Sequence, residues 1–418
     1  MEFGHVKPVN LSRKPNPETN AYIKKFPEED IMKKLLTIIT AFVLALPGYA
    51  AMAADPVRIG YSIAKTGLFA QAAPSQVTAY ELWMNQVNAR GGLNVGGVKR
   101  PIELVWYDDE SNPGKSAQIY EKLISDEKVD LLLAPWGTPH HLNVAGVVER
   151  HGFPMVGNTA ASVAIREVQP GNIWFPTSAI PDRIGKELAA FAQKSGVKSV
   201  AIIANVLPFA QENLQYLVPA LEAKGITVKL NESYPPDISD MTSLLTQIKA
   251  AKVDGVIALS YPADSFLYMG QAKELGIDSP FQFLLVGPTI SAFSQAFGPV
   301  ADGVVTIGHW SHHQSSWSRA KPFYDAYVKA YGMKPDNLDT ALAYMSCEIL
   351  EQAVATAGLD HDKLRKTISS STFDTINGPV RFDGVENAIT PTAFLQLQKG
   401  EMHLVWPANI ATSTYMPR

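Results

Sequence analysis

Two apolar runs between residues 131 and 162 each stop at residues that could bind a small anionic ligand. The first run covers residues 131–134 and the second covers residues 153–156. The residues after these runs are small, hydroxylated or aromatic: Trp136, Gly137 and Thr138 after the first, and Gly157, Asn158, Thr159 and Ser162 after the second. Short hydroxyls and unpaired backbone N–H groups are the donors that proteins use to hold carboxylates.

These residues need two neighbouring strands to bring them together. Residues 140–151 lie between the two runs and carry Val144, Val147 and Val148 at helical spacing. In an open α/β sheet, ligands bind beyond the carboxyl ends of parallel strands. The pattern therefore predicts a ligand site at two adjacent strand ends. A second interpretation stays open, in which Thr138 and Thr159 only cap helices.

The same alternation of strand and helix continues along the chain and predicts an α/β fold with parallel sheets and right-handed crossovers. Further strands are predicted at residues 57–62, 102–107, 173–175, 199–204, 227–230, 255–259, 281–286 and 304–307. Further helices are predicted at residues 77–89, 115–124, 182–193, 212–223, 242–250 and 265–275. After Trp310 the order changes to three helices, 321–331, 338–357 and 361–370, and then three strands, 380–382, 392–398 and 403–406.

A chain of 418 residues is too long for one core, so we expect two lobes. A second lobe interrupted by a return of the chain to the first would give three crossings, near Pro176, Gly308 and Leu397. The predicted N-terminal lobe contains residues 55–176 and 309–396. The predicted C-terminal lobe contains residues 177–308 and 397–418.

The start of the chain predicts export. Met32, Lys33 and Lys34 precede an apolar run at residues 35–46, and Ala51-Met52-Ala53 has the form of a signal-peptidase site. We therefore expect residues 32–54 to be a signal peptide and residues 1–31 to be an upstream extension with no role in the fold. The predicted location is the periplasm of a Gram-negative bacterium.

Charge and cysteine content narrow the function classes. Removing residues 1–54, with 7 basic and 5 acidic side chains, changes the net charge from -4 to -6, which disfavours nucleic-acid binding. The single cysteine, Cys347, has apolar neighbours and is predicted to be buried in a helix. No cysteine stands directly after the cleavage site, so we expect a free protein without a lipid anchor. We also expect a monomer.

Three patterns that resemble reactive sites lack the required context. Gly114-Lys115-Ser116 lacks the leading glycine of a phosphate-binding loop, because Asp109 occupies that position. His309, His312 and His313 match no common zinc spacing, and adjacent histidines on a strand point to opposite sides. No G-x-S-x-G elbow occurs. We therefore expect no metal, no cofactor and no enzymatic activity.

Several motifs in order resemble the branched-chain amino acid (Leu/Ile/Val) binding proteins of ABC importers. They are Gly60-Tyr61-Ser62 with residues 66–70, residues 85–92, residues 103–109 and residues 377–383. The resemblance covers essentially the whole chain after the signal peptide. It implies a type I periplasmic binding protein, in which two Rossmann-like lobes joined by three hinge crossings close on a small ligand and deliver it to a membrane permease.

The resemblance also implies roles for individual residues. Thr138 falls where the family has a hydroxyl residue that binds the ligand's carboxylate and amine. Thr159 falls where a backbone carbonyl meets the amine. Ala160, Ala161 and Ser162 follow in the same loop, with Ala161 at a position where a second hydroxyl is usual.

The second lobe contributes two aromatic positions and one departure from the family pattern. Phe209 matches a position often occupied by tyrosine, and Tyr261 matches an aromatic position on the cleft wall. Where amino acid binders place a glutamate against the ligand's ammonium, this chain has Thr289. Since an unpaired buried ammonium is costly, either the acid comes from elsewhere or the ligand has no amine.

We expect a carboxylate ligand that is aromatic or apolar, with a hydrophobic or branched-chain amino acid as the other possibility. Phe69, Trp136, Phe209 and Tyr261 are predicted to form an aromatic wall suited to flat rings. Arg183 and His140 are candidate charge partners for the carboxylate. An exported ligand sensor with the same fold remains an alternative to a transport protein, because both would use the same closure.

Overall fold

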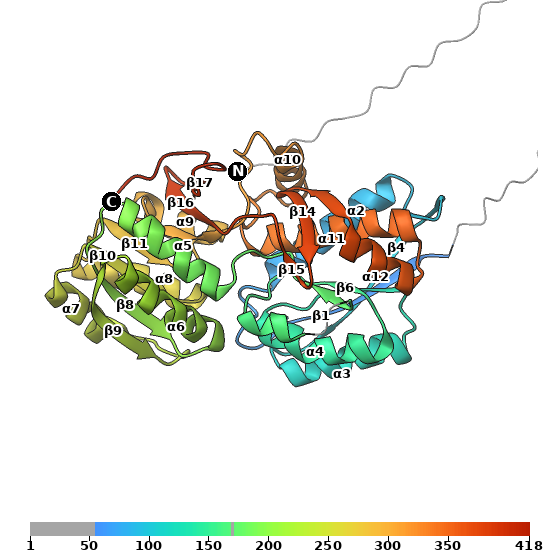
Figure 1. Ribbon diagram of the computed structural model, residues 1–418, viewed down its shortest axis with the longest axis horizontal. Coiled ribbons are helices and arrows are strands. Elements are labelled where there is room, and N and C mark those ends of the chain that lie inside the picture. The colour runs from blue at the N-terminus through green and yellow to red at the C-terminus, as the bar shows by residue number, and fades with distance from the viewer. Residues whose placement is uncertain (1–54, 169–170) are drawn as a thin grey trace, which may run out of the picture. The chain divides into compact units, whose positions relative to one another are not determined.

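The computed structural model describes residues 55–168 and 171–418 (Figure 1). The predicted upstream extension and signal peptide lie outside the described residues. Among the described helices, none combines the length and the hydropathy that a membrane span requires.

The first sheet has five parallel strands in the order β4-β1-β5-β6-β7. Its strands are β1 (Val57–Ile63), β4 (Ile102–Asp108), β5 (Leu131–Leu133), β6 (Met155–Val156) and β7 (Ile173–Trp174). Its helices are α2 (Pro74–Ala89), α3 (Pro113–Ser125), α4 (Thr138–His151), α10 (Ala320–Tyr331), α11 (Asp339–Ala357) and α12 (His361–Ser370). Helices α3 and α4 pack together on one face of this sheet, and α2 packs with α11 on the other (Figure 1).

The second sheet has seven strands in the order β17-β16-β12-β11-β10-β8-β9. Its strands are β8 (Ser199–Asn205), β9 (Thr227–Tyr234), β10 (Gly255–Leu259), β11 (Phe281–Leu284), β12 (Val305–Gly308), β16 (Ala393–Gln398) and β17 (Glu401–Trp406). Its helices are α5 (Pro181–Lys194), α6 (Pro208–Ala223), α7 (Thr242–Ala251), α8 (Pro262–Leu275) and α9 (Ser291–Phe297). Strands β16 and β17 are antiparallel additions to five parallel strands.

Short elements complete the described fold. They are the hairpin β2 (Leu93–Val95) and β3 (Val98–Arg100), the strands β13 (Thr372–Thr375), β14 (Gly378–Asp383) and β15 (Glu386–Asn387), and the 3-10 turns η1 (Val163–Glu167) and η2 (Gly298–Ala301).

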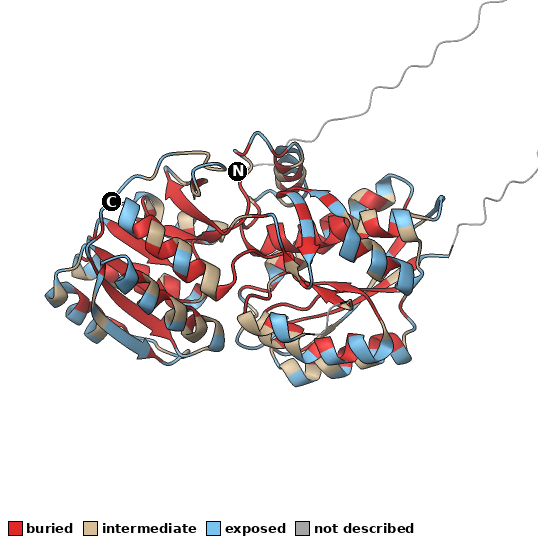
Figure 2. Ribbon diagram, in the orientation of Figure 1, coloured by how far each residue is buried: buried red, intermediate tan, exposed pale blue. Residues whose placement is uncertain are grey.

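Burial of the central strands explains why their sequences are largely apolar. All seven residues of β8 and all five of β10 are buried (Figure 2). A parallel sheet is covered by helices on both faces, so its strands do not alternate between apolar and polar residues. The α/β fold with parallel sheets is therefore confirmed.

The helix starts are the main local difference from the sequence prediction. Six of the helices that begin earlier than expected have a proline at their first or second position: Pro74, Pro113, Pro139, Pro181, Pro208 and Pro262. Proline suits this position because its missing N–H has no acceptor there and its φ angle is already helical. The prediction began these helices one to four residues later and so left out part of the opening turn.

The chain passes between the two sheets three times: after β7, after β12 and before β16. The three crossings of the predicted fold class are thus confirmed. The residue boundaries assigned to the two lobes stay a prediction. Strand β16 belongs to the seven-stranded sheet from Ala393 onward, four residues before the predicted third crossing at Leu397.

Candidate functional site

The ends of β5 and β6 lie side by side, as the sequence predicts. Leu132 pairs with Met155 and Leu133 pairs with Val156 in parallel register. The two loops that follow these strands therefore leave the same edge of the sheet.

Two threonine side chains tie these loops together. The N–H of Gly137 donates to Oγ1 of Thr159 at 2.7 Å, and the N–H of Ala161 donates to Oγ1 of Thr138 at 2.9 Å. Gly137 has φ of 84°, a value that favours glycine, and it directly precedes α4. Neither threonine accepts a capping bond from the first turn of α4, so the capping interpretation is wrong for this helix.

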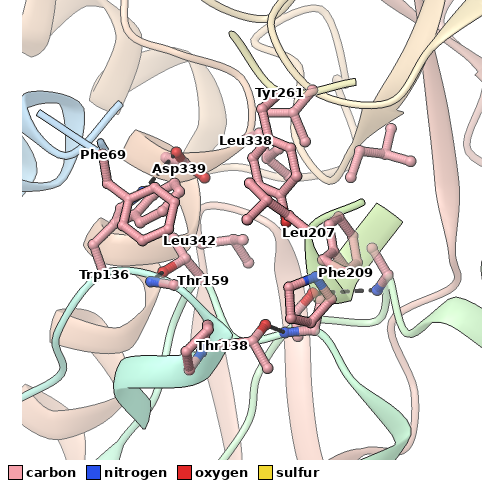
Figure 3. Close-up of a pocket in the computed structure, with 18 of the residues that line it drawn as sticks. Phe69, Trp136, Thr138, Thr159, Leu207, Phe209, Tyr261, Leu338, Asp339 and Leu342 are labelled. Carbon is pink, nitrogen blue, oxygen red and sulfur yellow. Dashed lines mark hydrogen bonds between the residues drawn. The ribbon is translucent and has the colours of Figure 1, made fainter. Parts of the chain in front are cut away.

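A pocket of about 750 Å³, open mouth included, lies against these loops (Figure 3). This is the size range of small-molecule sites. It is lined by eight of the eleven predicted residues: Phe69, Trp136, Gly137, Thr138, Thr159, Ala161, Phe209 and Tyr261. Their contact with a ligand stays a prediction.

The aromatic side chains form two walls of the pocket. The rings of Phe69 and Trp136 have centroids 4.9 Å apart. Phe209, in the first turn of α6, and Tyr261, just before α8, lie on the other side with Leu207 (Figure 3). These walls form a slot between two aromatic surfaces, which suits a flat or apolar ligand.

Three predicted residues do not line this pocket. Ala160 is fully buried in the core, and the hydroxyl of Ser162 accepts from the N–H of Ala164 at the start of η1. Thr289 is buried against Asp336, to which its hydroxyl donates at 3.3 Å. Loop residues so close in sequence cannot all face one cavity, because some must anchor the backbone.

The two candidate charge partners are engaged elsewhere. Arg183 donates to the Glu386 carboxylate at 2.7 Å. His140 is fully buried, with Nε2 3.5 Å from Oδ1 of Asp109. Neither residue lines the pocket, and no lysine or arginine is among the described residues that do.

The sequence analysis missed an acid in the pocket wall. Asp339 is the first residue of α11, and its Oδ2 accepts from Nε1 of Trp136 at 2.9 Å. Burial, and then the charge of Asp336, raises the pKa of Asp339 to about 8. The carboxyl group of Asp339 is therefore mainly protonated at neutral pH. It adds no negative charge to the pocket wall in that form.

Asp336 is the member of this pair that is better able to hold a negative charge. Burial also raises its pKa, but it accepts from the backbone N–H groups of Leu338 at 2.6 Å and Asp339 at 3.0 Å. Hydrogen bonds to the charged form favour it. The shared proton is therefore placed on Asp339, beside the pocket.

Two further residues that line the pocket also come shortly after the end of a strand. Thr177 follows β7 and His309 follows β12. Burial lowers the pKa of His309 to about 4, so its ring is neutral. The position after a strand end, which singled out Thr138 in the sequence, could have identified Thr177 and His309 as well. Asp339 had no such indication, because an acid at a helix start is common for capping alone.

Comparisons with known proteins agree with this architecture. The model of the periplasmic binding protein family matches residues 56–401, so the chain belongs to that family, whose members bind solutes and are not enzymes. The Leu/Ile/Val/Thr/Ala-binding protein of Pseudomonas aeruginosa is 24% identical over 347 residues, covering 81% of this chain and 90% of that protein. The resemblance to the branched-chain amino acid type is confirmed.

Two solved structures share the type I fold. One is a branched-chain amino acid substrate-binding protein from Streptococcus pneumoniae in complex with isoleucine, with TM-score 0.75 and 20% identity, covering 84% of this chain and all of that one. The other is a solute-binding protein of an ABC transporter from Rhodopseudomonas palustris in complex with 3,4-dihydroxybenzoic acid. Its TM-score is 0.72 at 22% identity, covering 83% of this chain and 95% of that one. Family membership implies a location outside the cytoplasm.

Replacing Thr138 by alanine should weaken ligand binding by about 1 to 3 kcal/mol, which is roughly 5- to 150-fold. The reason is the loss of one hydroxyl at the start of α4, together with the bond from Ala161 that positions the neighbouring loop. Calorimetric titration measures the change. Thr138→Ser, which keeps the hydroxyl, should bind nearly as well as the parent, and unaltered affinity in Thr138→Ala would remove this residue from the site.

Proposed function

We propose that this protein is the periplasmic solute-binding component of an ABC importer for small aromatic or apolar carboxylates. In this role the two lobes close on the ligand and deliver it to a membrane permease. The predicted signal peptide at residues 32–54 would direct the chain to the periplasm, where it acts as a monomer.

The observation that carries this proposal is the composition of the pocket wall. Two aromatic surfaces enclose the space, and the acid in the wall, Asp339, is held mainly in its neutral form. A neutral carboxyl can donate a hydrogen bond to an anionic ligand, whereas an ionised one would repel it. The hydroxyl of Thr138 and the first N–H groups of α4 supply further donors for a carboxylate.

A hydrophobic or branched-chain amino acid is the second candidate, and one observation favours it. Asp339 provides the acid that Thr289 does not, so a ligand ammonium could be paired if Asp339 gave up its proton. Such a ligand must draw the pKa of Asp339 down from about 8 at a cost in binding free energy. We therefore place the amine-free acid first.

A thermal-shift screen tests the proposal. Benzoate, 4-hydroxybenzoate and 3-phenylpropanoate should raise the melting temperature more than leucine, isoleucine or valine. Ligand present at about 100 times its Kd stabilises the folded state by about 2.7 kcal/mol, an effect of several degrees. A larger shift with valine would favour the second candidate. If neither the acids nor the amino acids raised the melting temperature, both the transport role and the alternative role as a ligand sensor would be overturned.

A further inference from the structure

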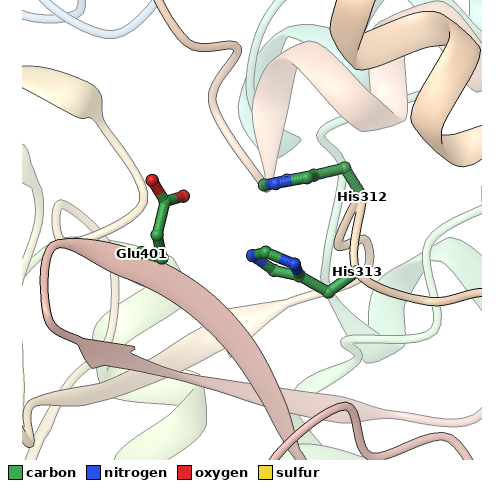
Figure 4. A group of neighbouring side chains, drawn as sticks. All are labelled: His312, His313 and Glu401. Carbon is green, nitrogen blue, oxygen red and sulfur yellow. The ribbon is translucent and has the colours of Figure 1, made fainter.

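A group of histidine and glutamate side chains lies away from the pocket, between two segments far apart in sequence. His312 and His313 lie in a turn of the segment that follows β12. Glu401 is the first residue of β17. One donor atom from each of the three residues lies within 4.8 Å of the other two (Figure 4).

The turn explains why adjacent histidines can act together. On a strand their rings would point to opposite sides, which is the assumption behind the expectation of no metal. In the turn, the ring centroids of His312 and His313 are only 3.9 Å apart, and the Glu401 carboxylate faces both rings (Figure 4). The objection from sequence therefore does not apply to the structure.

Neighbouring aromatic groups hold both rings in place. The ring of His312 stacks on Tyr324 at 3.8 Å, and the ring of His313 stacks on His403 at 4.3 Å. His403 is two residues beyond Glu401 on β17, so both side chains leave the same face of the strand. These stacking contacts orient the two imidazole rings.

An unsatisfied atom points to a missing partner. Nδ1 of His312 is buried and has no hydrogen-bond partner among the described residues, and Nδ1 of His403 shares this property. Buried polar atoms are normally paired, by protein, water or an ion. His312 and Glu401 also line a small cavity together with Tyr324 and Lys334, so there is space beside the cluster for an added ion.

From this arrangement we propose that His312, His313 and Glu401 form a binding site for a divalent transition-metal cation. Two imidazoles and one carboxylate suit zinc and its first-row neighbours, and three protein ligands leave room for water. Bonds of about 2.0 to 2.2 Å require the donors to move closer than they are now. The exposed ring of His313 and the 35% exposed side chain of Glu401 can make that movement without the backbone.

Replacing Lys334 should strengthen metal binding, whereas replacing a proposed metal ligand should weaken it. The Lys334 ammonium lies 2.5 Å from Oε1 of Glu401 and competes with a metal ion for that carboxylate. Because this side chain is 43% exposed, it can turn into solvent when a cation binds. Replacing it by glutamine removes the competing charge, so Lys334→Gln should bind the cation more tightly than the parent.

Calorimetric titration of the tag-free exported chain with Zn²⁺ tests the site. We expect one high-affinity equivalent and a higher melting temperature with zinc. His313→Gln and Glu401→Gln should each weaken binding by about tenfold or more, as should His312→Gln. The matched control is His151→Gln, since His151 also pairs with a glutamate, Glu121, but no second histidine of the described chain joins that pair. This control should bind zinc as the parent does.

Visible absorption of the Co²⁺-loaded protein provides a second measurement. Low-symmetry cobalt bands should appear in the parent and in His151→Gln and be lost in His313→Gln. His313 is exposed, so its replacement should not impair folding, and unchanged far-UV circular dichroism would verify this. Equal zinc affinity in the parent and in His313→Gln would overturn the proposal, as would the absence of any high-affinity equivalent.

Discussion

Replacing Trp136 by alanine is expected to reduce ligand affinity by roughly 30-fold or more. Truncating a buried aromatic anchor typically costs more than 2 kcal/mol of binding free energy. In this case the change removes one aromatic wall, including its contact with Phe69, and it leaves Asp339 without the donor at 2.9 Å. Calorimetric titration with the best ligand from the screen measures the loss.

Two further variants separate the contributions of Trp136. Trp136→Phe keeps a ring in the wall but loses the donor to Asp339, so its affinity should lie between those of the parent and Trp136→Ala. The control is Trp106→Ala, because Trp106 on β4 is 39% exposed and does not line the pocket. Full affinity in Trp136→Ala would show that this wall does not contact the ligand.

Replacing Asp339 by asparagine is expected to change how protein stability depends on pH. The folded protein keeps a proton on Asp339 up to about pH 8, whereas an unfolded chain releases it near pH 4. Between these values the folded state binds more protons, so the free energy of unfolding falls as pH rises, by up to about 1.4 kcal/mol per pH unit. The stability contributed by this proton is present at low pH and lost towards pH 8.

Asparagine cannot ionise and still offers an oxygen to Trp136. Relative to the parent, Asp339→Asn should therefore become progressively more stable between pH 5 and pH 8, by a total of a few kcal/mol. Burial also raises the pKa of Glu348 to about 8. The stability of both proteins will therefore still fall to some extent as pH rises. Melting temperatures across this pH range provide the measurement.

The matched control for this series is Asp325→Asn. Asp325 is exposed and pairs with Lys321 on the surface of α10, so this variant should follow the parent at every pH. Parallel melting curves for the parent and Asp339→Asn would mean that Asp339 is ionised in the folded protein. The pocket would then hold a negative charge, and an amine-bearing ligand would become the better candidate.

Local sequence patterns predicted most of the fold because they are direct consequences of burial. The runs that became β8 and β10 are apolar except at the ends of β8, since helices cover both faces of their sheet. The short strands β2, β3 and β13 were missed, because strands of three or four residues are too short to show a comparable pattern. Helix starts were missed where a proline occupies the first or second position of the helix.

The pocket was only partly predictable, for a different reason. Thr138 and Trp136 follow a strand end, a local feature that marks them in the sequence. Asp339 reaches the pocket through the packing of α11, a helix buried over most of its length, and Thr289 turns away to contact Asp336. Such placements depend on tertiary contacts between distant segments, which no local pattern encodes.

The most direct test of the central claim compares two ligands that differ only in the amine. Calorimetric titration at neutral pH should show that 3-phenylpropanoate binds more tightly than phenylalanine, because burial raises the pKa of Asp339 to about 8 and no other acid is among the described residues that line the pocket. Tighter binding of phenylalanine would contradict the account and make this chain an amino acid binding protein whose Asp339 loses its proton when the ligand enters.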